Sequence, residues 1–211
     1  VVVRLCDVSP SGSSKRISYG VLNLAMRNGL DCPKIVVPGE VMDVSIKFDD
    51  TGYEIPAGHK LRLAVSTAYF PLIWPAPKKA KLTLDLAFSY LTVPCHDRTE
   101  TLLRDLGQGY VCPVKKTKKI RPEKHDRLVQ IDARDGLVTT KINDDFGKYT
   151  FLEHNLTVGE SCKEIHSILP DDPCSAMSDC SWHAQQSRPG WNVDIYSHLK
   201  VTCDEAYFYL N

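Results

Sequence analysis

Several features that would mark a membrane protein or a nucleic-acid-binding protein are missing from this sequence. No run of apolar residues approaches the ~20 that a helix needs to span a bilayer. The 211 residues include 26 Lys+Arg and 26 Asp+Glu, so the formal net charge is zero. Because no long-range positive field can attract nucleic acid or an anionic lipid surface, we expect neither a nucleic acid nor a membrane as a partner.

The eight cysteines include no pair with C-x-x-C spacing. The tightest cluster is Cys174, Cys180 and His183, with Cys162 and His166 just upstream. A zinc site could be built from these residues, but their spacing is not that of a finger or ribbon. We therefore predict no metal and no cofactor, and instead scattered buried thiols, with a bridge such as Cys174–Cys180 left open. A chain of this size can bury a core without disulfides, which favours the cytoplasm over secretion.

Helix signals are scarce, and apolar residues recur instead with a period of two between Gly/Pro turns. This pattern is typical of half-buried antiparallel strands in a sandwich or barrel. The strands expected are residues 1–7, 20–27, 41–48, 60–68 and 82–86 in the first half, and residues 128–133, 136–142, 149–152, 162–169, 181–187 and 191–201 in the second. Turns are expected at residues 132–135, 143–147 and 188–190, and a possible short helix at residues 100–105. The sequence thus predicts an all-β chain.

Three parts follow from the spacing of these elements. We predict a β-sandwich over residues 1–94, a linker or long connection over residues 95–127, and a β-rich C-terminal segment over residues 128–211. The connection contains Cys95, His96 and the basic run at residues 115–121, which we interpret as solvated. Both chain ends alternate like strands, so we expect them to lie within strands of a longer protein.

An ordered series of motifs in residues 1–94 resembles the C-terminal domain of the X-prolyl dipeptidyl-peptidase and cocaine-esterase group of α/β-hydrolases. The series consists of RLCDV at residues 4–8, GSS at 12–14, GVLNL at 20–24, PGE at 38–40, PAGHKLRL at 56–63 and STAYFP at 66–71. The second half is similar to the longer members of the group, in NDDFGKY at residues 143–149 and WNVDI at residues 191–195.

The resemblance implies a jelly-roll sandwich of the galactose-binding-like type. In the family this domain packs on an upstream α/β-hydrolase domain, which carries the catalytic Ser, Asp and His, and it helps to shape the substrate cleft. The nucleophile elbow of that domain needs G-x-S-x-G, and this chain has none. No catalytic residue can be carried over, so we expect a non-catalytic part of a serine peptidase or esterase. Its partners would be the upstream hydrolase domain and, left open, further copies of the chain.

The loop at residues 69–75, YFPLIWP, is the best candidate for contact with a partner. We single out Tyr69, Phe70 and Trp74 there, because aromatic rings offer large rigid area, and His59 at the start of a strand. His59 could order the loop beneath it through a bond from its ring N–H to a carbonyl. The loop could pack on its own sandwich, meet the hydrolase domain, or stack on a sugar. The last option would make the chain a stand-alone carbohydrate-binding module. A further alternative for the whole chain is a disulfide-stapled secreted interaction domain.

Overall fold

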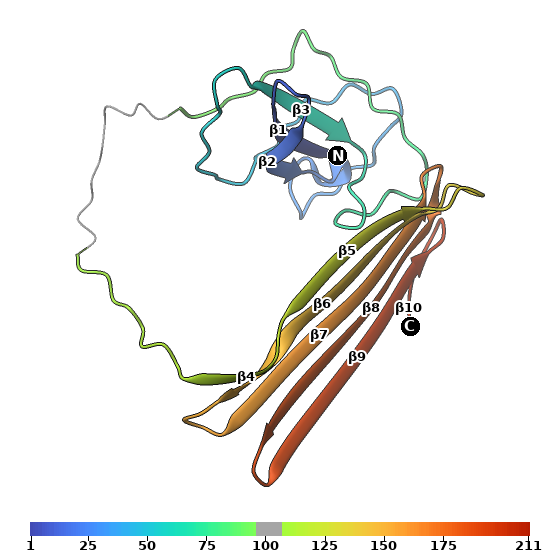
Figure 1. The fold of residues 1–211 in the computed structure, drawn as a ribbon. Helices are drawn as coiled ribbons and strands as arrows, with labels where there is room; N and C mark the ends of the chain where they lie inside the picture. Colours follow the sequence, from blue (N-terminus) through green and yellow to red (C-terminus); the bar gives the residue numbers. More distant parts are fainter. Residues whose placement is uncertain (96–106) are drawn as a thin grey trace. The chain divides into compact units, whose positions relative to one another are not determined.

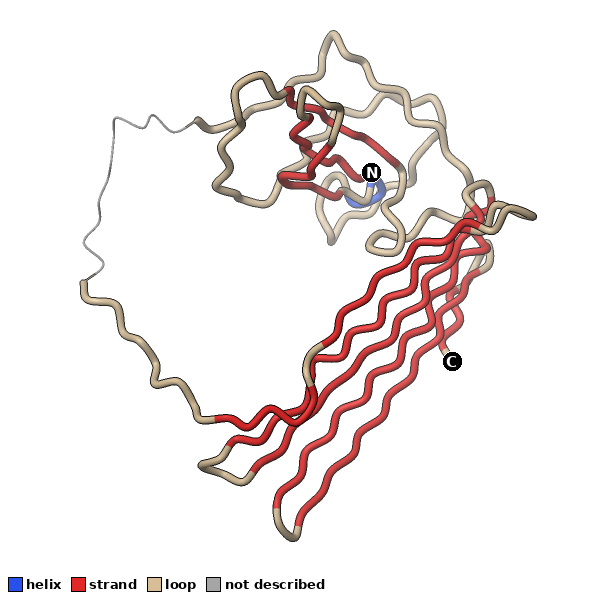
Figure 2. Tube along the Cα trace, viewed as in Figure 1, coloured by secondary structure: helices blue, strands red, loops and turns tan. Residues whose placement is uncertain are grey.

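A computed structural model describes residues 1–95 and 107–211 of the chain (Figure 1). The possible helix at residues 100–105 and His96 lie outside the described residues. The chain divides into two compact units, Val1–Leu82 and Thr83–Asn211. Strands and loops make up the described residues apart from one 3-10 turn (Figure 2), which confirms the prediction of an all-β chain. The two antiparallel sheets, of three and seven strands, are consistent with the sandwich class predicted.

The first unit is built on a three-stranded sheet with β1 (Val2–Val8) in the centre. Strands β2 (Ser14–Val21) and β3 (Lys60–Ser66) pair with β1 on either side, both antiparallel. β1 carries the best-buried apolar side chains of this unit: Val2, Leu5 and Cys6. The strands predicted at residues 1–7 and 60–68 are thus confirmed, with small shifts at their ends.

The strand predicted at residues 41–48 is wrong, although its alternation is regular. The segment lies against β2 without forming a ladder, since a Cβ added to Gly20 would come within 2.4 Å of the Lys47 carbonyl oxygen. One backbone bond, from Asp49 N to the Tyr19 oxygen, and one from Ser18 Oγ to the Asp49 oxygen hold it there. Close contact at a glycine therefore takes the place of strand pairing.

Two other predicted strands of the first half also differ from the structure. The strand at residues 20–27 ends at Val21, and η1 (Leu24–Met26) follows, because the Asn23 side chain accepts a bond from Ala25 N at 3.0 Å. Residues 82–86 form no strand. Asp85 begins a turn there, in which its side chain accepts from Ala87 N and its carbonyl from Ser89 Oγ. In both places a short polar side chain binds nearby backbone and ends the extended run.

The second unit is an antiparallel sheet of seven strands in which consecutive strands form long hairpins (Figure 1). The order is β10-β9-β8-β7-β6-β4, and β5 also pairs with β6. The strands are β4 (Thr117–Arg121), β5 (Lys124–Ile131), β6 (Val138–Phe151), β7 (Leu156–Leu169), β8 (Asp172–Arg188), β9 (Trp191–Cys203) and β10 (Phe208–Leu210). Each segment predicted as a strand in this half overlaps an observed strand, but the two predicted at residues 136–142 and 149–152 are parts of the single strand β6. Most of the observed strands are longer than predicted. β4 and the first residues of β5 lie within the segment predicted as a connection, and the basic run there is exposed.

The turn predicted at residues 143–147 is wrong, because this segment is a bulge inside the single strand β6. The pairing register shifts between Asp145 and Lys148, and Gly147 adopts φ +83°. Asp145 Oδ1 accepts from Gly147 N at 2.8 Å, and Arg121 pairs with the same carboxylate at 2.8 Å. Bulges use the same residue types as turns, so the sequence pattern could not separate the two.

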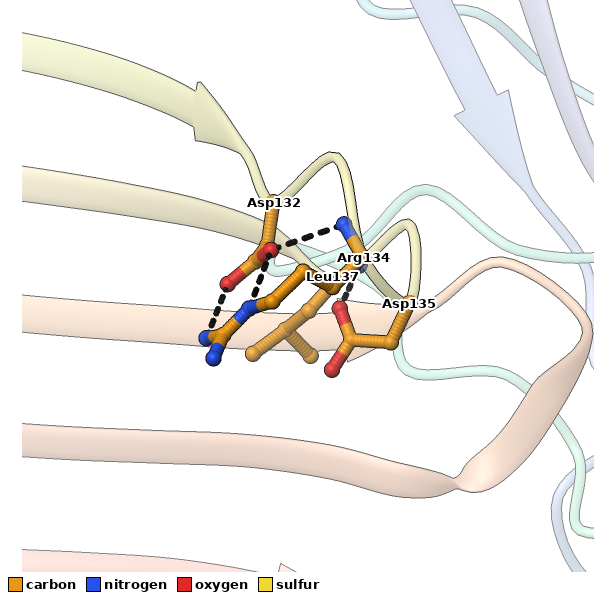
Figure 3. A network of polar contacts seen from close by, with 4 residues as sticks. All are labelled: Asp132, Arg134, Asp135 and Leu137. Atoms are coloured by element: carbon orange, nitrogen blue, oxygen red, sulfur yellow. Dashed lines mark hydrogen bonds and ion pairs between the residues drawn. The ribbon is translucent and has the colours of Figure 1, made fainter.

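The turn predicted at residues 132–135 joins β5 to β6 (Figure 3). The Asp132 carboxylate accepts from the backbone N–H and from the guanidinium of Arg134, and Asp135 Oδ1 accepts from Leu137 N at 2.9 Å. Gly136 supplies the positive φ that closes the hairpin. The turn predicted at residues 188–190 likewise joins β8 to β9.

The seven-stranded sheet buries few side chains. Among the described residues of this unit, the best-buried side chains are Cys162, His166, Ser167, Ala176 and Ser178, all on β7 and β8. Large apolar side chains such as Ile131, Ile195 and Tyr196 are mostly exposed. No helix in the part of the chain that the structure describes is long and apolar enough to cross a membrane.

Candidate functional site

The first unit has a buried carboxylate, Asp7, at the end of its central strand. Asp7 is only 5% exposed. Its Oδ2 accepts from the Tyr53 hydroxyl at 2.7 Å, and its Oδ1 accepts from His59 Nδ1 at 2.7 Å. His59 therefore does order a loop, but through a carboxylate instead of the carbonyl that we predicted. Asp7 fastens two distant segments of chain, around residues 53 and 59, to the sheet.

The two hydrogen bonds set the protonation of this group. The bond from Tyr53, followed by the bond from His59, lowers the pKa of Asp7 below the usual aspartate value. The same contact raises the pKa of Tyr53, because a phenol that donates to a carboxylate holds its proton more tightly. The cluster is thus stable with an ionised Asp7 and a neutral Tyr53.

The aromatic loop begins directly after β3 and is closed by its own backbone. Tyr69 and Ile73 exchange two backbone hydrogen bonds, of 2.9 and 2.8 Å. Ser66 Oγ donates to the Ala68 oxygen at 2.7 Å where the loop leaves the strand. The loop is thus a tight reverse turn of fixed shape, as a preformed contact surface requires.

Two arginines pack on the tyrosines beside this loop. The Arg4 guanidinium lies 4.8 Å from the centre of the Tyr69 ring, and Arg16 lies 4.9 Å from the centre of the Tyr19 ring. Arg16 Nη1 also donates to the Tyr69 hydroxyl at 2.9 Å. A bulge in β2, where the register shifts opposite Leu5 and Cys6, allows Arg16 and Tyr19 to share one face despite their odd spacing. We call Arg4, Arg16, Tyr19 and Tyr69 the arginine–tyrosine cluster.

The other two aromatic residues predicted for contact lie together. Phe70 and Trp74 pack edge to face with ring centres 5.5 Å apart, and both are half-buried. The structure therefore brings Tyr69, Phe70 and Trp74 into one loop, as predicted, and places His59 in the separate Asp7 cluster. Whether these residues contact a partner stays a prediction.

Sequence reasoning missed the partners of these residues, namely Arg4, Asp7, Arg16, Tyr19 and Tyr53. One signal was available, since Arg4 and Asp7 stand within an otherwise apolar strand. A charged side chain in such a strand must find a partner, because an unpaired buried charge is costly. The identity of the partner depends on the β2 bulge and on long loops, which the pattern does not reveal.

One chain of hydrogen bonds in the second unit has the composition of a catalytic triad. Ser178 Oγ lies 2.8 Å from His166 Nδ1, and His166 Nε2 lies 2.9 Å from Glu164 Oε2. An acyl-transfer site also needs unpaired backbone N–H groups at the developing oxyanion. Ser178 lies within β8, which is paired to β7 and β9 along this stretch, so the neighbouring N–H groups belong to the ladders. The arrangement does not form a nucleophile elbow.

All eight cysteines lie within the described residues, and all are thiols. Cys174 and Cys180 lie on one strand, six residues apart, so their Cα atoms are separated by about 20 Å. Since a disulfide requires Cα atoms within about 7 Å, the bridge considered between them cannot form.

Comparison with known proteins agrees with the absence of a nucleophile elbow from this chain. A model of the family described as "X-Pro dipeptidyl-peptidase C-terminal non-catalytic domain" matches residues 1–120. The Xaa-Pro dipeptidyl-peptidases of Streptococcus pneumoniae serotype 19F (strain G54) and of strain ATCC BAA-255 / R6 are each 35% identical over 92 residues. Each match covers 43% of this chain and 12% of the relative, so the chain corresponds to a small part of those proteins. No solved structure matches. The chain belongs to the family of X-Pro dipeptidyl-peptidase C-terminal non-catalytic domains.

Proposed function

We propose that this chain is the non-catalytic β-region of a serine peptidase or esterase, and that it packs on an upstream α/β-hydrolase domain of the same polypeptide. It would supply walls of the substrate cleft and leave the Ser, His and Asp chemistry to that domain. The observation that carries this proposal is the family match over residues 1–120. The jelly-roll form of the first part, its extent over residues 1–94 and contacts with further copies of the chain are parts of the same proposal.

The aromatic loop and the arginine–tyrosine cluster support a contact surface in the first unit. Aromatic side chains each bury about 150 to 250 Å² when covered, and interfaces are enriched in them and in arginine. The loop is already closed by the Tyr69–Ile73 backbone bonds, so little conformational entropy would be lost on docking. A rigid group of rings beside two cations suits a partner surface that offers apolar area with a rim of acceptors.

Arg4 adds a more specific indication. Its Nε atom is buried and has no hydrogen-bond partner among the described residues. A buried donor without an acceptor costs free energy, so such groups normally meet a carboxylate, a carbonyl or water. This chain already covers the atom, so an acceptor from the hydrolase domain would reach it only with a movement of the Arg4 side chain.

The arrangement of the rings is less suited to the stand-alone carbohydrate-binding module. Sugars stack on a flat, uncovered aromatic face, whereas Arg4 lies over the Tyr69 ring and Phe70 packs edge-on to Trp74. Calorimetry of the chain against a panel of mono- and oligosaccharides should show no saturable heat. Saturable heat that Trp74→Ala abolishes would favour the module instead.

Hydrogen exchange measured by mass spectrometry tests the docking proposal directly. The loop amides at residues 69–75 should exchange at least about tenfold more slowly in the intact polypeptide than in the 211-residue chain. Peptides from β8 (Asp172–Arg188) serve as the internal reference. Equal exchange of the loop in the two forms would show that the hydrolase domain does not cover it.

Hydrolysis by the chain alone is the second test. The purified chain should not turn over chromogenic acyl esters or Xaa-Pro anilides, and Ser178→Ala should leave the background rate unchanged. Turnover that is lost in Ser178→Ala would show that the Ser178–His166–Glu164 chain is catalytic and would overturn the non-catalytic assignment.

A further inference from the structure

A cluster of side chains with metal-ligand chemistry surrounds His166, one of the best-buried residues of the seven-stranded sheet. Cys162, Glu164 and His166 occupy alternate positions of β7, so they project from the same face of the sheet. The register places Cys180 of β8 opposite Glu164, and therefore on that face too. Cys162 and His166 are 5% and 7% exposed, whereas Glu164 reaches toward solvent and leaves a path for an ion.

The ligand atoms already lie close together. One atom each of Glu164, His166 and Cys180 lies within 4.8 Å of the others. Cys162 Sγ donates to Glu164 Oε1 at 3.5 Å, which brings a second thiol to the same carboxylate. Ligands around a tetrahedral Zn²⁺ are about 3.3 to 3.8 Å apart, so side-chain movements of roughly 1 Å would bring the atoms of Glu164, His166 and Cys180 onto one ion. Cys162 is four residues from His166 on the same strand, so their Cα atoms are about 13 Å apart and Cys162 is too far to join them as a ligand.

We propose that Glu164, His166 and Cys180 form a binding site for a thiophilic divalent cation, Zn²⁺ or its analogue Co²⁺, with the fourth position open to water. One thiolate, one imidazole and one carboxylate make a donor set that suits Zn²⁺ and disfavours Mg²⁺ and Ca²⁺. The Cys180 thiol loses a proton on binding, so one proton is released for each ion bound. The ion would bridge β7 and β8 at the best-buried point of a sheet that buries few side chains.

The surroundings of His166 fit this role. Ser178 Oγ lies 2.8 Å from its Nδ1 and can accept a bond from that N–H. With an ion on Nε2, the atom that faces Glu164, the imidazole would keep its proton on Nδ1 and donate it to Ser178.

A disulfide between the two thiols is the competing structure for these residues. Cys162 pairs directly with Trp182, and Glu164 with Cys180, so the two cysteines are diagonal neighbours. Diagonal Cα atoms lie about 7 to 8 Å apart, beyond the usual disulfide range, so the Cys180 thiol stays available to an ion.

Cobalt titration of the reduced full chain tests the site. One equivalent of Co²⁺ should give the visible bands of a tetrahedral ion and a thiolate-to-cobalt charge-transfer band, and Zn²⁺ should bleach both. Cys180→Ser and His166→Ala should weaken binding by more than about 100-fold, and Ser178→Ala by about 10- to 100-fold. Cys174→Ser, on the same strand but outside the site, is the matched control and should bind Co²⁺ as the unaltered chain does.

Four outcomes would overturn the proposal. These are the absence of tetrahedral bands, bands that survive in Cys180→Ser, bands that depend on Cys174 instead, and a Cys162–Cys180 disulfide found by mass mapping of the unreduced chain. Circular dichroism shows whether each variant keeps its sheet, and the conservative Glu164→Gln provides a second ligand variant if His166→Ala does not fold.

Discussion

The two units of this chain hold their backbone in different ways. The first has only three strands, and long loops are tied to them by a few polar contacts, above all those of Asp7. The second consists of long hairpins whose backbone is satisfied by regular ladders, although few side chains are buried. We infer that single side chains decide the stability of the first unit, whereas stability in the second is spread along the strands and concentrated at special backbone positions.

Among the changes that test this difference between the two units, removal of the Asp7 charge should have the largest effect. Asp7→Asn replaces an acceptor of two charge-assisted bonds with an amide that can accept only through one oxygen. Loops around Tyr53 and His59 should then open, and their amides should exchange at least about tenfold faster. Hydrogen exchange by mass spectrometry measures this change peptide by peptide.

The control for Asp7 is Asp43→Asn, an exposed aspartate of the same unit, which should leave exchange unchanged. Peptides from β7 and β8 should be unaffected in both variants. Equal acceleration in both units would mean that Asp7 supports the whole chain, and the contrast drawn between the units would then be wrong.

The pH dependence of hydrogen exchange in the first unit should report the ionisation of Asp7 and of Tyr53. The folded pKa of Asp7 is depressed, so its contribution is fully present above the unfolded value of about 3.9 and is lost as pH falls through the lower folded value. The pKa of Tyr53 is raised, so its contribution is present below about 10 and is lost as pH rises through the higher folded value. The protection of the loop amides, which is the intrinsic exchange rate at a given pH divided by the measured rate, should thus fall at both extremes.

In the plot of loop protection against pH, the fall at low pH is the acid limb and the fall at high pH is the alkaline limb. Tyr53→Phe tests which groups cause them. It removes the alkaline limb altogether, and it reduces the acid limb because the largest cause of the Asp7 shift is lost. A profile that keeps its alkaline limb in Tyr53→Phe would assign that limb to another group.

The sequence predicted the second unit better than the first, and the reason is physical. A period of two reports a half-buried strand, and in the hairpins of β5 to β9 each strand pairs with its neighbour in the chain. In the first unit, residues 41–48 show the same period but have no ladder partner, since Gly20 brings them against β2 by close packing. Alternation specifies which side chains share a face and does not specify whether a partner strand is present.

The candidate contact loop was predictable from its composition, and its supporting residues were not. Tyr69, Phe70 and Trp74 stand out in the sequence because three aromatic residues and two prolines fall within seven residues. Arg16 reaches Tyr69 across 53 residues and only because β2 bulges. The metal-ligand cluster shows the same limit, because proximity in sequence favoured Cys174 and His183. In the structure His183 pairs with Asp194 instead, and the pairing of β7 with β8 brings Cys180 to His166.

Within the second unit, the bulge at Gly147 should be the most sensitive backbone position. A Cβ there would lie 3.0 Å from the Arg121 carbonyl oxygen, and the substituted residue would also have to adopt a positive φ. Gly147→Ala should therefore lower the free energy of unfolding of this unit by about 1 to 3 kcal/mol. Gly190→Ala has a similar φ but open space around its Cβ, so about 1 kcal/mol is expected.

Denaturant unfolding followed by the fluorescence of Trp182 and Trp191, which both lie in this unit, compares the two glycine variants. A Gly190→Ala variant as unstable as Gly147→Ala would show that φ alone, without the contact to β4, sets the cost.

The smallest effect is expected at the hairpin between β5 and β6. The bidentate pair of Arg134 with Asp132 looks strong by geometry, with an N–O distance of 2.8 Å, but the Arg134 side chain is 89% exposed. Solvent screens such pairs, and ordering a long side chain costs entropy, so Arg134→Ala should leave the unfolding midpoint of the second unit unchanged. Asp132→Ala should shift it measurably, because Asp132 also accepts from the backbone N–H of Arg134 and shapes the turn (Figure 3). If both variants shifted the midpoint equally, the ion pair itself would close the hairpin, and stability in this unit would depend on single side chains as it does in the first.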